Sequence, residues 1–301
     1  MSIFVLKLIA LIAMLIDHVA EVLGWEGWNT LTINAKWLRY IGRISFPIFA
    51  FCIVSGWVHS HNRKRYFQRL CLCAVISQIP YSLALYTPNL MPVRKGFETP
   101  FYFHVMPLFL GVALFCTFTY WYFVLNKKYD ATIWLILLTC AFPAILLRVN
   151  YMWIMTGSFN VLYTLALGMM ILYIIEKYKS KMRWWKYVWL TAAGILALLA
   201  YGSNADYGIC LMGVILIVAL YLTRKHQIMQ AIVIVLWGFL LYGIIIGNLK
   251  NALATIISAA LVLLYNSKAG QNERFAKYLF YGFYPVHLLI IGFINIYFRL
   301  G

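Results

Sequence analysis

Residues 7–18 form an apolar stretch, Lys7-Leu-Ile-Ala-Leu-Ile-Ala-Met-Leu-Ile-Asp17-His18, that has ionisable side chains at both of its ends. At about 100° of rotation per residue, Lys7 and His18 lie about three helical turns apart on one stripe, with Glu21 close to that stripe. Asp17 lies on the neighbouring flank, because adjacent residues of a helix do not share a face. An ionisable group within a bilayer costs on the order of 3 kcal/mol, so such groups usually face the protein interior and serve a function. This stretch therefore predicts a first membrane-spanning helix with a functional polar stripe.

The composition is that of a membrane protein. Of the 301 residues, 64% are hydrophobic and 11% are charged, which excludes an ordinary soluble domain. No long polar segment divides the sequence, so we expect residues 1–301 to form a single transmembrane domain. The net charge of +17 does not indicate nucleic-acid binding, because Lys and Arg occur in short clusters between apolar segments, as topology signals do. We therefore expect an all-α, polytopic protein whose partners include membrane lipids and no nucleic acid.

Apolar windows of about 17 to 25 residues predict about 11 transmembrane helices, which we expect to surround a central tunnel. Their predicted bounds are 3–24, 38–60, 68–86, 104–125, 131–148, 158–176, 185–202, 207–223, 228–247, 249–265 and 277–298. The first of these contains Asp17 and His18 and is followed by no small-residue cleavage site, so we interpret it as a retained span rather than a signal peptide.

Clusters of basic residues predict the orientation. Together with Lys7, most of the Lys and Arg residues follow the even-numbered spans: Arg63, Lys64, Arg65, Arg69, Lys127, Lys128, Lys177, Lys179, Lys181, Arg183, Lys186, Arg224, Lys225, Lys268, Arg274 and Lys277. Because cytoplasmic loops are enriched in Lys and Arg, this pattern predicts a cytoplasmic N-terminus. The longest polar segment, 86–103, is then an outside loop, long enough to fold back over a cavity.

The six cysteines give no sign of a metal centre or a disulfide framework. They lie in apolar segments and form no Cys-x-x-Cys pair, so we expect them to be packing residues. The cysteines are Cys52, Cys71, Cys73, Cys116, Cys140 and Cys210.

Several polar residues are predicted at similar depths in the outer half of the membrane. The first span places Asp17 and His18 there, and the second places Arg43 at a similar level. His104 opens the fourth span from outside, and Asp206 opens the eighth span from outside. Two alternatives give these residues no catalytic role: Arg43 could extend to the outer interface, and His18 could only hydrogen-bond a neighbouring helix.

The last span brings a second polar pair to about mid-membrane. Tyr284 and His287 are three residues apart and share a helix face. Pro285 lies between them and has no N–H to donate to the carbonyl of Tyr281, which predicts a kink with an unused acceptor.

A set of motifs runs in order along nearly the whole chain. After residues 6–18 these are Ile41-Gly42-Arg43-Ile44-Ser45-Phe46-Pro47-Ile48-Phe49-Ala50-Phe51, Ser55-Gly56-Trp57, Arg69-Leu70, Ser77-Gln78-Ile79-Pro80-Tyr81, Phe159-Asn160-Val161-Leu162-Tyr163-Thr164-Leu165-Ala166-Leu167-Gly168, Asp206-Tyr207-Gly208 and Phe280-Tyr281-Gly282-Phe283-Tyr284-Pro285-Val286-His287-Leu288. In this order they resemble the TraX family of conjugal-transfer proteins.

The resemblance implies a multi-pass acetyltransferase of the bacterial inner membrane, which acetylates the N-terminal amine of a pilin subunit. The donor would be acetyl-CoA from the cytoplasm, and no metal is implied. The family is similar to the wider transmembrane acyltransferases, whose first helix carries a basic residue and a histidine with ten residues between them. Lys7 and His18 have that spacing, with lysine in place of the commoner arginine and so without its bidentate fork. We therefore expect His18 and Asp17 in catalysis and Lys7 and Arg43 in binding the acyl donor.

We hypothesise that neutral His18 is the general base that takes a proton from the acceptor as it attacks the thioester. A carboxylate would orient His18, and Asp17 and Asp206 are the candidates; if Asp17 instead pairs with Arg43, Asp206 takes that role. His287 is a further candidate for orienting the substrate or the base. The candidates for stabilising the developing oxyanion are Arg43, His104 and Tyr284.

Three other functions stay open at this point. The acceptor could be a hydroxyl of a glycan or lipid instead of an amine. A chain with buried charges also suits a proton-coupled transporter or a flippase, although the sequence has no repeat symmetry and few broken helix pairs. A protein that only binds pilin during assembly would tolerate the loss of Lys7 and His18 together.

Overall fold

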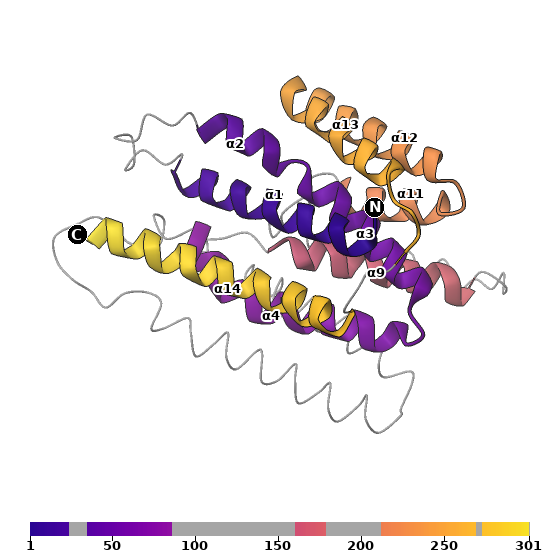
Figure 1. Ribbon diagram of the computed structural model, residues 1–301, viewed down its shortest axis with the longest axis horizontal. Coiled ribbons are helices and arrows are strands. Elements are labelled where there is room, and N and C mark those ends of the chain that lie inside the picture. The colour runs from indigo at the N-terminus through magenta and orange to yellow at the C-terminus, as the bar shows by residue number, and fades with distance from the viewer. Residues whose placement is uncertain (24–34, 86–159, 179–211, 269–272, 301) are drawn as a thin grey trace.

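The computed structural model describes residues 1–23, 35–85, 160–178, 212–268 and 273–300, and within these ranges every regular element is a helix (Figure 1). The helices are α1 (Ile3–Leu23), α2 (Ala35–Gly42), α3 (Ser45–His59), α4 (Arg63–Leu85), α9 (Val161–Tyr178), α11 (Met212–Leu222), α12 (Gln227–Gly238), the π-helix η3 (Phe239–Ile245), α13 (Leu249–Leu263) and α14 (Glu273–Leu300). The predicted spans 104–125, 131–148 and 185–202 and the loop 86–103 lie outside these ranges.

The helices have the apolar composition of a membrane protein. Among the described residues, three helices are long and apolar enough to cross a membrane, namely Ile3–Val22, Trp37–His59 and Gln227–Ile245. Shorter apolar helices are Val161–Tyr173, Met212–Leu222, Leu249–Leu263 and Tyr278–Ile294. The all-helical prediction is confirmed for this part of the chain, while the number of about 11 spans and the cytoplasmic N-terminus stay predictions.

The second predicted span is interrupted near its start. Its helical course breaks between α2 and α3, where Arg43 N–H donates to the Arg39 carbonyl and Ile44 N–H donates to the Ile41 carbonyl. The hydroxyl of Ser45 donates to the Gly42 carbonyl at 2.7 Å, which gives that carbonyl a partner at the break. The predicted span 38–60 passes through this interruption, because a hydropathy window of that length averages over Gly42, Arg43 and Ser45.

A short turn joins η3 to α13. Gly247 has a φ of 73°, a left-handed conformation that glycine adopts without steric cost. The side chain of Asn248 then accepts a hydrogen bond from Asn251 N–H and caps the start of α13. This turn is why two consecutive apolar segments form an antiparallel pair instead of one long helix.

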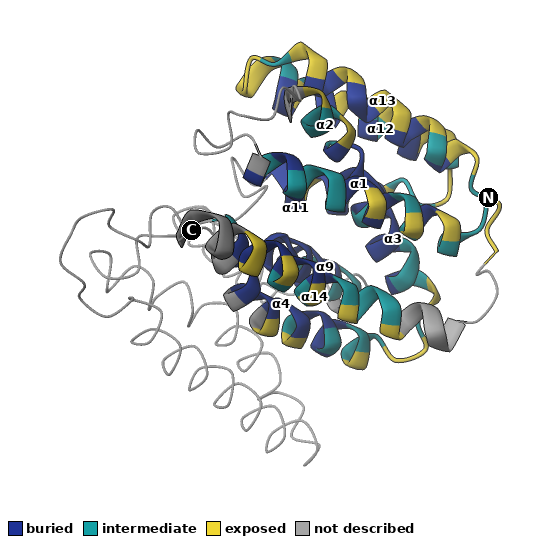
Figure 2. Cartoon of the chain, turned by 60° about the vertical axis from the view of Figure 1, so that its left-hand side comes forward, coloured by how far each residue is buried: buried dark blue, intermediate teal, exposed yellow. Residues whose placement is uncertain are grey.

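Helix α1 lies at the centre of the described bundle. It packs against α2, α3, α4 and α14, and Figure 1 shows it running between α2 and α14. The pair α4 and α14 lies on one side of it, and the pair α12 and α13 lies on the other (Figures 1 and 2). Polar groups on the inward faces of α1 and α14 therefore meet in the interior.

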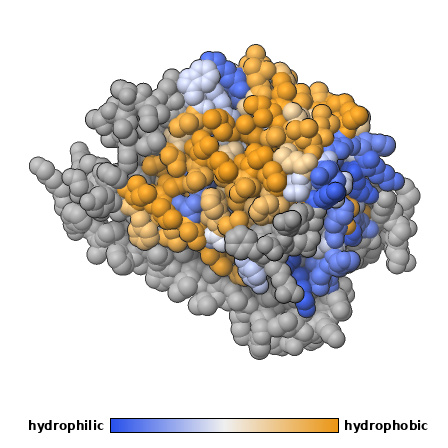
Figure 3. Space-filling view, viewed as in Figure 1, coloured by the Kyte–Doolittle hydropathy of each residue, from blue (hydrophilic) through white to orange (hydrophobic). Residues whose placement is uncertain are grey.

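The outward faces of several helices are apolar. Figure 2 shows the exposed residues on the outer sides of α1, α12, α13 and α14, and Figure 3 shows hydrophobic side chains over much of the same view. The exposed large hydrophobic residues include Leu8, Ile12, Ile228, Ile232, Leu236, Ile256, Ile257, Val286, Ile290 and Phe293. A soluble protein rarely exposes such a surface, whereas lipid tails would cover it.

Hydrophilic residues gather at one end of the molecule, near the N-terminus (Figure 3). We call this the basic end and define it by Arg63, Arg65, Arg224, Lys225 and Lys268. Contacts between chain segments bring it together: Arg63 pairs with Glu176 at 2.5 Å, and Ile3 N–H donates to the Lys268 carbonyl at 2.9 Å. The members of these clusters that the structure describes thus lie at one end of it.

Candidate active site

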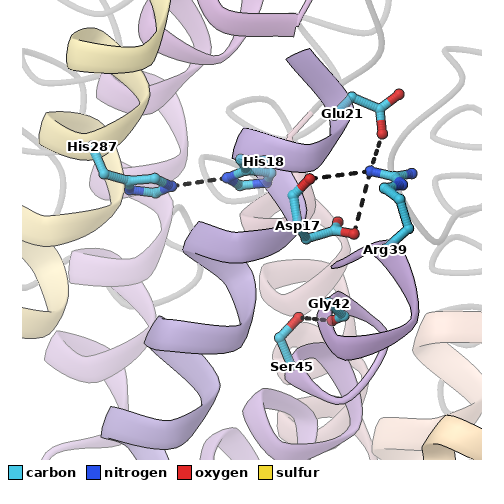
Figure 4. Close-up of polar contacts among 7 residues, drawn as sticks. All are labelled: Asp17, His18, Glu21, Arg39, Gly42, Ser45 and His287. Atoms are coloured by element: carbon cyan, nitrogen blue, oxygen red, sulfur yellow. Dashed lines mark hydrogen bonds and ion pairs between the residues drawn. The ribbon is translucent and has the colours of Figure 1, made fainter. Parts of the chain in front are cut away.

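Two histidines meet in the interior between α1 and α14 (Figure 4). Nδ1 of His18 lies 2.8 Å from Nε2 of His287, and the two side chains belong to residues that are only 6% and 5% exposed. The ring planes differ by 5° while the ring centres are 5.1 Å apart. The two nitrogens are much closer than the two ring centres, so the parallel rings meet edge to edge and do not stack face to face. This is the geometry of a hydrogen bond between the nitrogens.

The position of His18 along α1 agrees with the predicted depth. At a rise of about 1.5 Å per residue, His18 lies about 22 Å along the axis from Ile3. Since Ile3 is at the basic end and a hydrocarbon core is about 30 Å thick, the imidazole lies in the half of the bundle remote from that end.

The ring of His287 is held by its own helix. Its Nδ1 lies 2.7 Å from the carbonyl oxygen of Phe283, one turn earlier, and the Phe283 ring stacks on it with centres 4.8 Å apart. The kink residue Pro285 leaves the Tyr281 carbonyl without its helical donor, and the thiol of Cys73 on α4 donates to that carbonyl at 3.5 Å. The acceptor predicted from Pro285 is therefore present, and α4 supplies its partner.

Tyr284 completes the aromatic surroundings of the histidine pair. Its buried ring meets the rings of both His18 and His287 edge to face, with centres 6.4 Å and 5.6 Å away. The sequence placed Tyr284 and His287 on one helix face, and the structure confirms that both lie against α1.

Asp17 points to the other side of α1, toward α2 (Figure 4). Its carboxylate lies 3.3 Å from a guanidinium nitrogen of Arg39, which also pairs with Glu21 and donates to the Asp17 carbonyl. The partner of Asp17 is therefore Arg39, one turn before the predicted Arg43. Because Asp17 and His18 are adjacent on the helix, the carboxylate faces α2 while the imidazole faces α14.

Arg39 is not among the residues predicted from the sequence. It lies four residues before Arg43, at the spacing that places two residues on one helix face. Both arginines act electrostatically on the His18 ring. Arg39 lies in α2, whereas Arg43 lies at the break between α2 and α3. The guanidinium of Arg43 lies over the Tyr242 ring, 5.8 Å from its centre. The prediction that Arg43 lies near the level of His18 agrees with this arrangement.

Lys7 lies on α1 between the basic end and His18. Its ammonium is 5.3 Å from the centre of the Phe280 ring on α14, and its charge also acts on the buried thiol of Cys52. A further cation, Arg69 of α4, lies beside the hydroxyl of Tyr281 on α14. Arg69 is also missing from the predicted site residues, although it belongs to one of the motifs in the sequence.

Some predicted site residues cannot be placed. His104 and Asp206 lie outside the described residues, and so does the segment 86–103 that was expected to cover a cavity. In the ranges that the structure describes, no three His, Cys, Asp or Glu side chains form a group that could hold a metal ion.

The arrangement is suited to moving a proton. His18 hydrogen-bonds a described residue through Nδ1 alone, so its Nε2 is the nitrogen that could serve an incoming substrate. Arg39 and Arg43 provide positive charge that acts on the ring, and the Tyr284 ring meets it edge to face. A buried imidazole with cations close by is an arrangement that can combine general-base and oxyanion-stabilising roles.

Comparisons with known proteins agree with the membrane character and with the sequence motifs. The family model described as "TraX protein" matches residues 2–156 and 149–295 of the chain. A similar protein is the "Probable fimbrial assembly protein FimC, serogroup H1" of Dichelobacter nodosus, which is 28% identical over 300 residues. That match covers 96% of this chain and 94% of the relative. No solved structure matches the chain.

Proposed function

Because this chain belongs to the TraX family, we propose that it is an integral-membrane acetyltransferase with acetyl-CoA as donor and the N-terminal amine of a pilin or similar small protein as acceptor. The membrane would be the inner membrane of a bacterium. The name of the Dichelobacter nodosus relative, a probable fimbrial assembly protein, supports a pilin subunit as the acceptor.

The observation that carries the proposal is the buried imidazole of His18, hydrogen-bonded to His287 at 2.8 Å inside an apolar bundle. A general base needs a ring held in one orientation within reach of the acceptor, and this pair provides such a hold. Asp17, the other catalytic candidate, joins α1 to α2 through its ion pair with Arg39.

The two ends of the bundle suit the two substrates. Acetyl-CoA cannot cross a bilayer, and its phosphates would be attracted to Arg63, Arg224 and the other cations of the basic end. The thioester arm would extend past Lys7 toward His18. Because His18 lies in the half of the bundle remote from the basic end, the acceptor could approach from that far end. An acceptor amine would then reach the site from the outer side or laterally from the lipid.

In the proposed reaction the neutral amine attacks the thioester carbonyl, and Nε2 of His18 takes a proton from the nitrogen as the C–N bond forms. Arg43 and Tyr284 are placed near the ring and would stabilise the oxyanion of the tetrahedral intermediate. The C–S bond then breaks, and the CoA thiolate takes the proton from His18. The products are the N-acetylated protein and free CoA, with no change of oxidation state.

The test uses the purified full-length protein in detergent, labelled acetyl-CoA and a synthetic peptide with a free N-terminal amine. We expect His18→Ala to lower transfer about 10²-fold or more, the usual contribution of a general base. The matched control is His61→Ala, because His61 is an exposed histidine near the basic end. Undiminished transfer by the His18→Ala protein would remove His18 from the mechanism.

The same assay separates the other candidate functions. A peptide whose N-terminus is already acetylated should accept nothing, whereas transfer to glycan or lipid hydroxyls would make the protein an O-acyltransferase. A transporter would show no transfer in detergent, where no gradient exists. A pure assembly factor would keep its function when Lys7 and His18 are replaced together.

A further inference from the structure

The hydrogen bonds of the histidine pair have a defined direction. A carbonyl oxygen only accepts, so the contact of 2.7 Å between Nδ1 of His287 and the Phe283 carbonyl requires that this Nδ1 carries the proton. In a neutral imidazole the second nitrogen then has no proton and is an acceptor. The contact of 2.8 Å from His18 must therefore be donated by Nδ1–H of His18. This leaves Nε2 of His18 as the nitrogen with the free electron pair.

The alternative direction requires a doubly protonated His287. That cation would lie buried near Arg39 and Arg43, whose charges already act on the neighbouring His18 ring. None of the described carboxylates contacts either ring, since Asp17 and Glu21 pair with Arg39 and Glu176 pairs with Arg63. A second buried cation without a carboxylate is costly, so the neutral pair is the state that the surroundings favour.

We propose that His287 is a positioning residue, which fixes the tautomer of His18 so that Nε2 serves as the base. The inference rests on the proposed function for its catalytic meaning, but the tautomer itself does not. In serine hydrolases a buried carboxylate holds the base histidine in the correct tautomer. Here a histidine that is locked by its own helix backbone provides the same restraint without a charge.

The lock on His287 is a local property of a helix. His59 makes the same contact, with its Nδ1 lying 2.8 Å from the Ser55 carbonyl one turn earlier. At His287 the stacked Phe283 ring and the edge contact of Tyr284 hold the ring in this rotamer. Contacts within α14 therefore fix which nitrogen of His287 carries the proton before any substrate binds.

The same geometry limits where a proton can go. An amide carbonyl accepts a hydrogen bond but does not take up a proton, so the chain from His18 through His287 ends at Phe283. A proton gained by Nε2 of His18 from the amine must leave from Nε2 again, to the departing CoA thiolate. The pair is thus built to hold a base and not to conduct protons along α14.

The direct test is nuclear magnetic resonance of the full-length protein in detergent micelles, with 15N-labelled histidine side chains. The signals of His18 are identified by their absence from His18→Gln protein. We expect Nδ1 of His18 to be protonated and Nε2 to be unprotonated in the wild-type protein. A protonated Nε2 in the resting wild-type protein would overturn the inference, and this measurement needs neither a substrate nor a change at His287.

Kinetics of two substitutions give an independent reading. His287→Leu removes the acceptor and should lower kcat about 10²-fold or more, with KM for acetyl-CoA changed less than about 2-fold, because orientation of the base is lost while donor binding is kept. His287→Gln keeps an acceptor oxygen that can be turned to His18 Nδ1–H and should restore a substantial part of kcat. Equal loss in both variants would mean that His287 acts only through packing.

The two proposals fail in different ways. If His18→Ala abolishes transfer and His287→Leu does not lower kcat, the protein is the proposed enzyme but His287 does not position the base. If the wild-type protein transfers acetyl groups to no amine, the proposed function fails, while the 15N spectra of the wild-type and His287→Leu proteins still decide whether His287 fixes the tautomer of His18.

Discussion

At Gly42 the backbone of α2 touches the side chain of Asp17 so closely that a methyl group has no room. A Cβ at Gly42 would lie 2.2 Å from Oδ1 and 2.3 Å from Cβ of Asp17. We expect Gly42→Ala to push Asp17 away from Arg39 and to lower the free energy of unfolding by about 1–3 kcal/mol, as overpacking does. Thermal unfolding in detergent and the acetyl-transfer assay measure the two consequences.

The matched control for this change is Gly282→Ala on α14. A Cβ at Gly282 meets nothing within 4 Å, although this glycine lies within two turns of His287. Alanine in a helix interior is favoured over glycine by about 0.5–1 kcal/mol, so this variant should be as stable as the wild type or slightly more so. Equal destabilisation by both substitutions would show that the contact between Gly42 and Asp17 is not the cause.

The sequence indicated the two histidines of the site, but it indicated neither their pairing nor the roles of Arg39 and Arg69. The cost of burying ionisable groups singles out His18, Asp17 and His287. Helical periodicity then gives depth and face, but it does not say which helices touch. The sequence therefore offered a carboxylate as the partner of His18, whereas the structure brings His287 to the ring and turns Asp17 to Arg39.

On the scale of elements, a buried polar cluster joins the start of α9 to the second half of α4. Asn160 is 0% exposed; its amide donates to the Ala74 carbonyl at 2.8 Å and to Oε1 of Gln78 at 2.9 Å. Its own Oδ1 accepts from Leu162 N–H at the start of α9. The two motifs that contain Gln78 and Asn160 are thus neighbours in space, and they fix α9 against α4.

We expect Asn160→Ala to lower stability strongly, because each buried partner left without a hydrogen bond costs about 1–3 kcal/mol. The comparison variant is Asn248→Ala, since the Asn248 side chain also accepts from a backbone N–H at a helix start, and that hydrogen bond lies within the first turn of α13. Losing that cap should cost about 1 kcal/mol. Thermal unfolding of the two variants in the same detergent measures the difference, and a larger loss for Asn248→Ala would contradict the role assigned to Asn160.

Element bounds agree with the sequence where composition alone decides them. The predicted spans 3–24, 228–247 and 277–298 correspond closely to α1, to α12 with η3, and to α14. The break between α2 and α3 was not predicted, because a hydropathy window averages over Gly42 and Arg43. The π-helix at Phe239–Ile245 was not predicted, because it occurs inside a continuous apolar run. Such irregularities depend on contacts between helices, for example the Ser258 hydroxyl donating to the Ile44 carbonyl at 3.0 Å.

On the scale of the molecule, contacts between helix ends define which ends lie together. The start of α4 meets the end of α9 through Arg63 and Glu176, and Tyr221 at the end of α11 donates to Glu176 at 2.7 Å. At the start of α12, Gln227 donates to the Val262 carbonyl near the end of α13. Among the described helices, α4 and α12 therefore begin at the basic end, whereas α9, α11 and α13 end there. This is the arrangement that the positive-inside pattern predicts for odd-numbered and even-numbered spans.

The orientation of the whole bundle gives the last prediction. Cysteine at an exposed basic-end position, His61→Cys or Lys225→Cys, should react with a membrane-impermeant maleimide only when the cytoplasmic side is accessible, as in inside-out vesicles. A cysteine at position 246 (Ile246→Cys), in the turn after η3 at the far end, should react with the same maleimide added to the outside of intact cells. The described native cysteines are buried or partly buried, and the parent protein labelled in parallel reports their background.

Labelling of both ends from the same side would mean that α12 does not cross the membrane. The opposite sidedness would place the cations outside, away from a cytoplasmic acyl donor, and would remove the geometric basis for acetyl-CoA reaching His18.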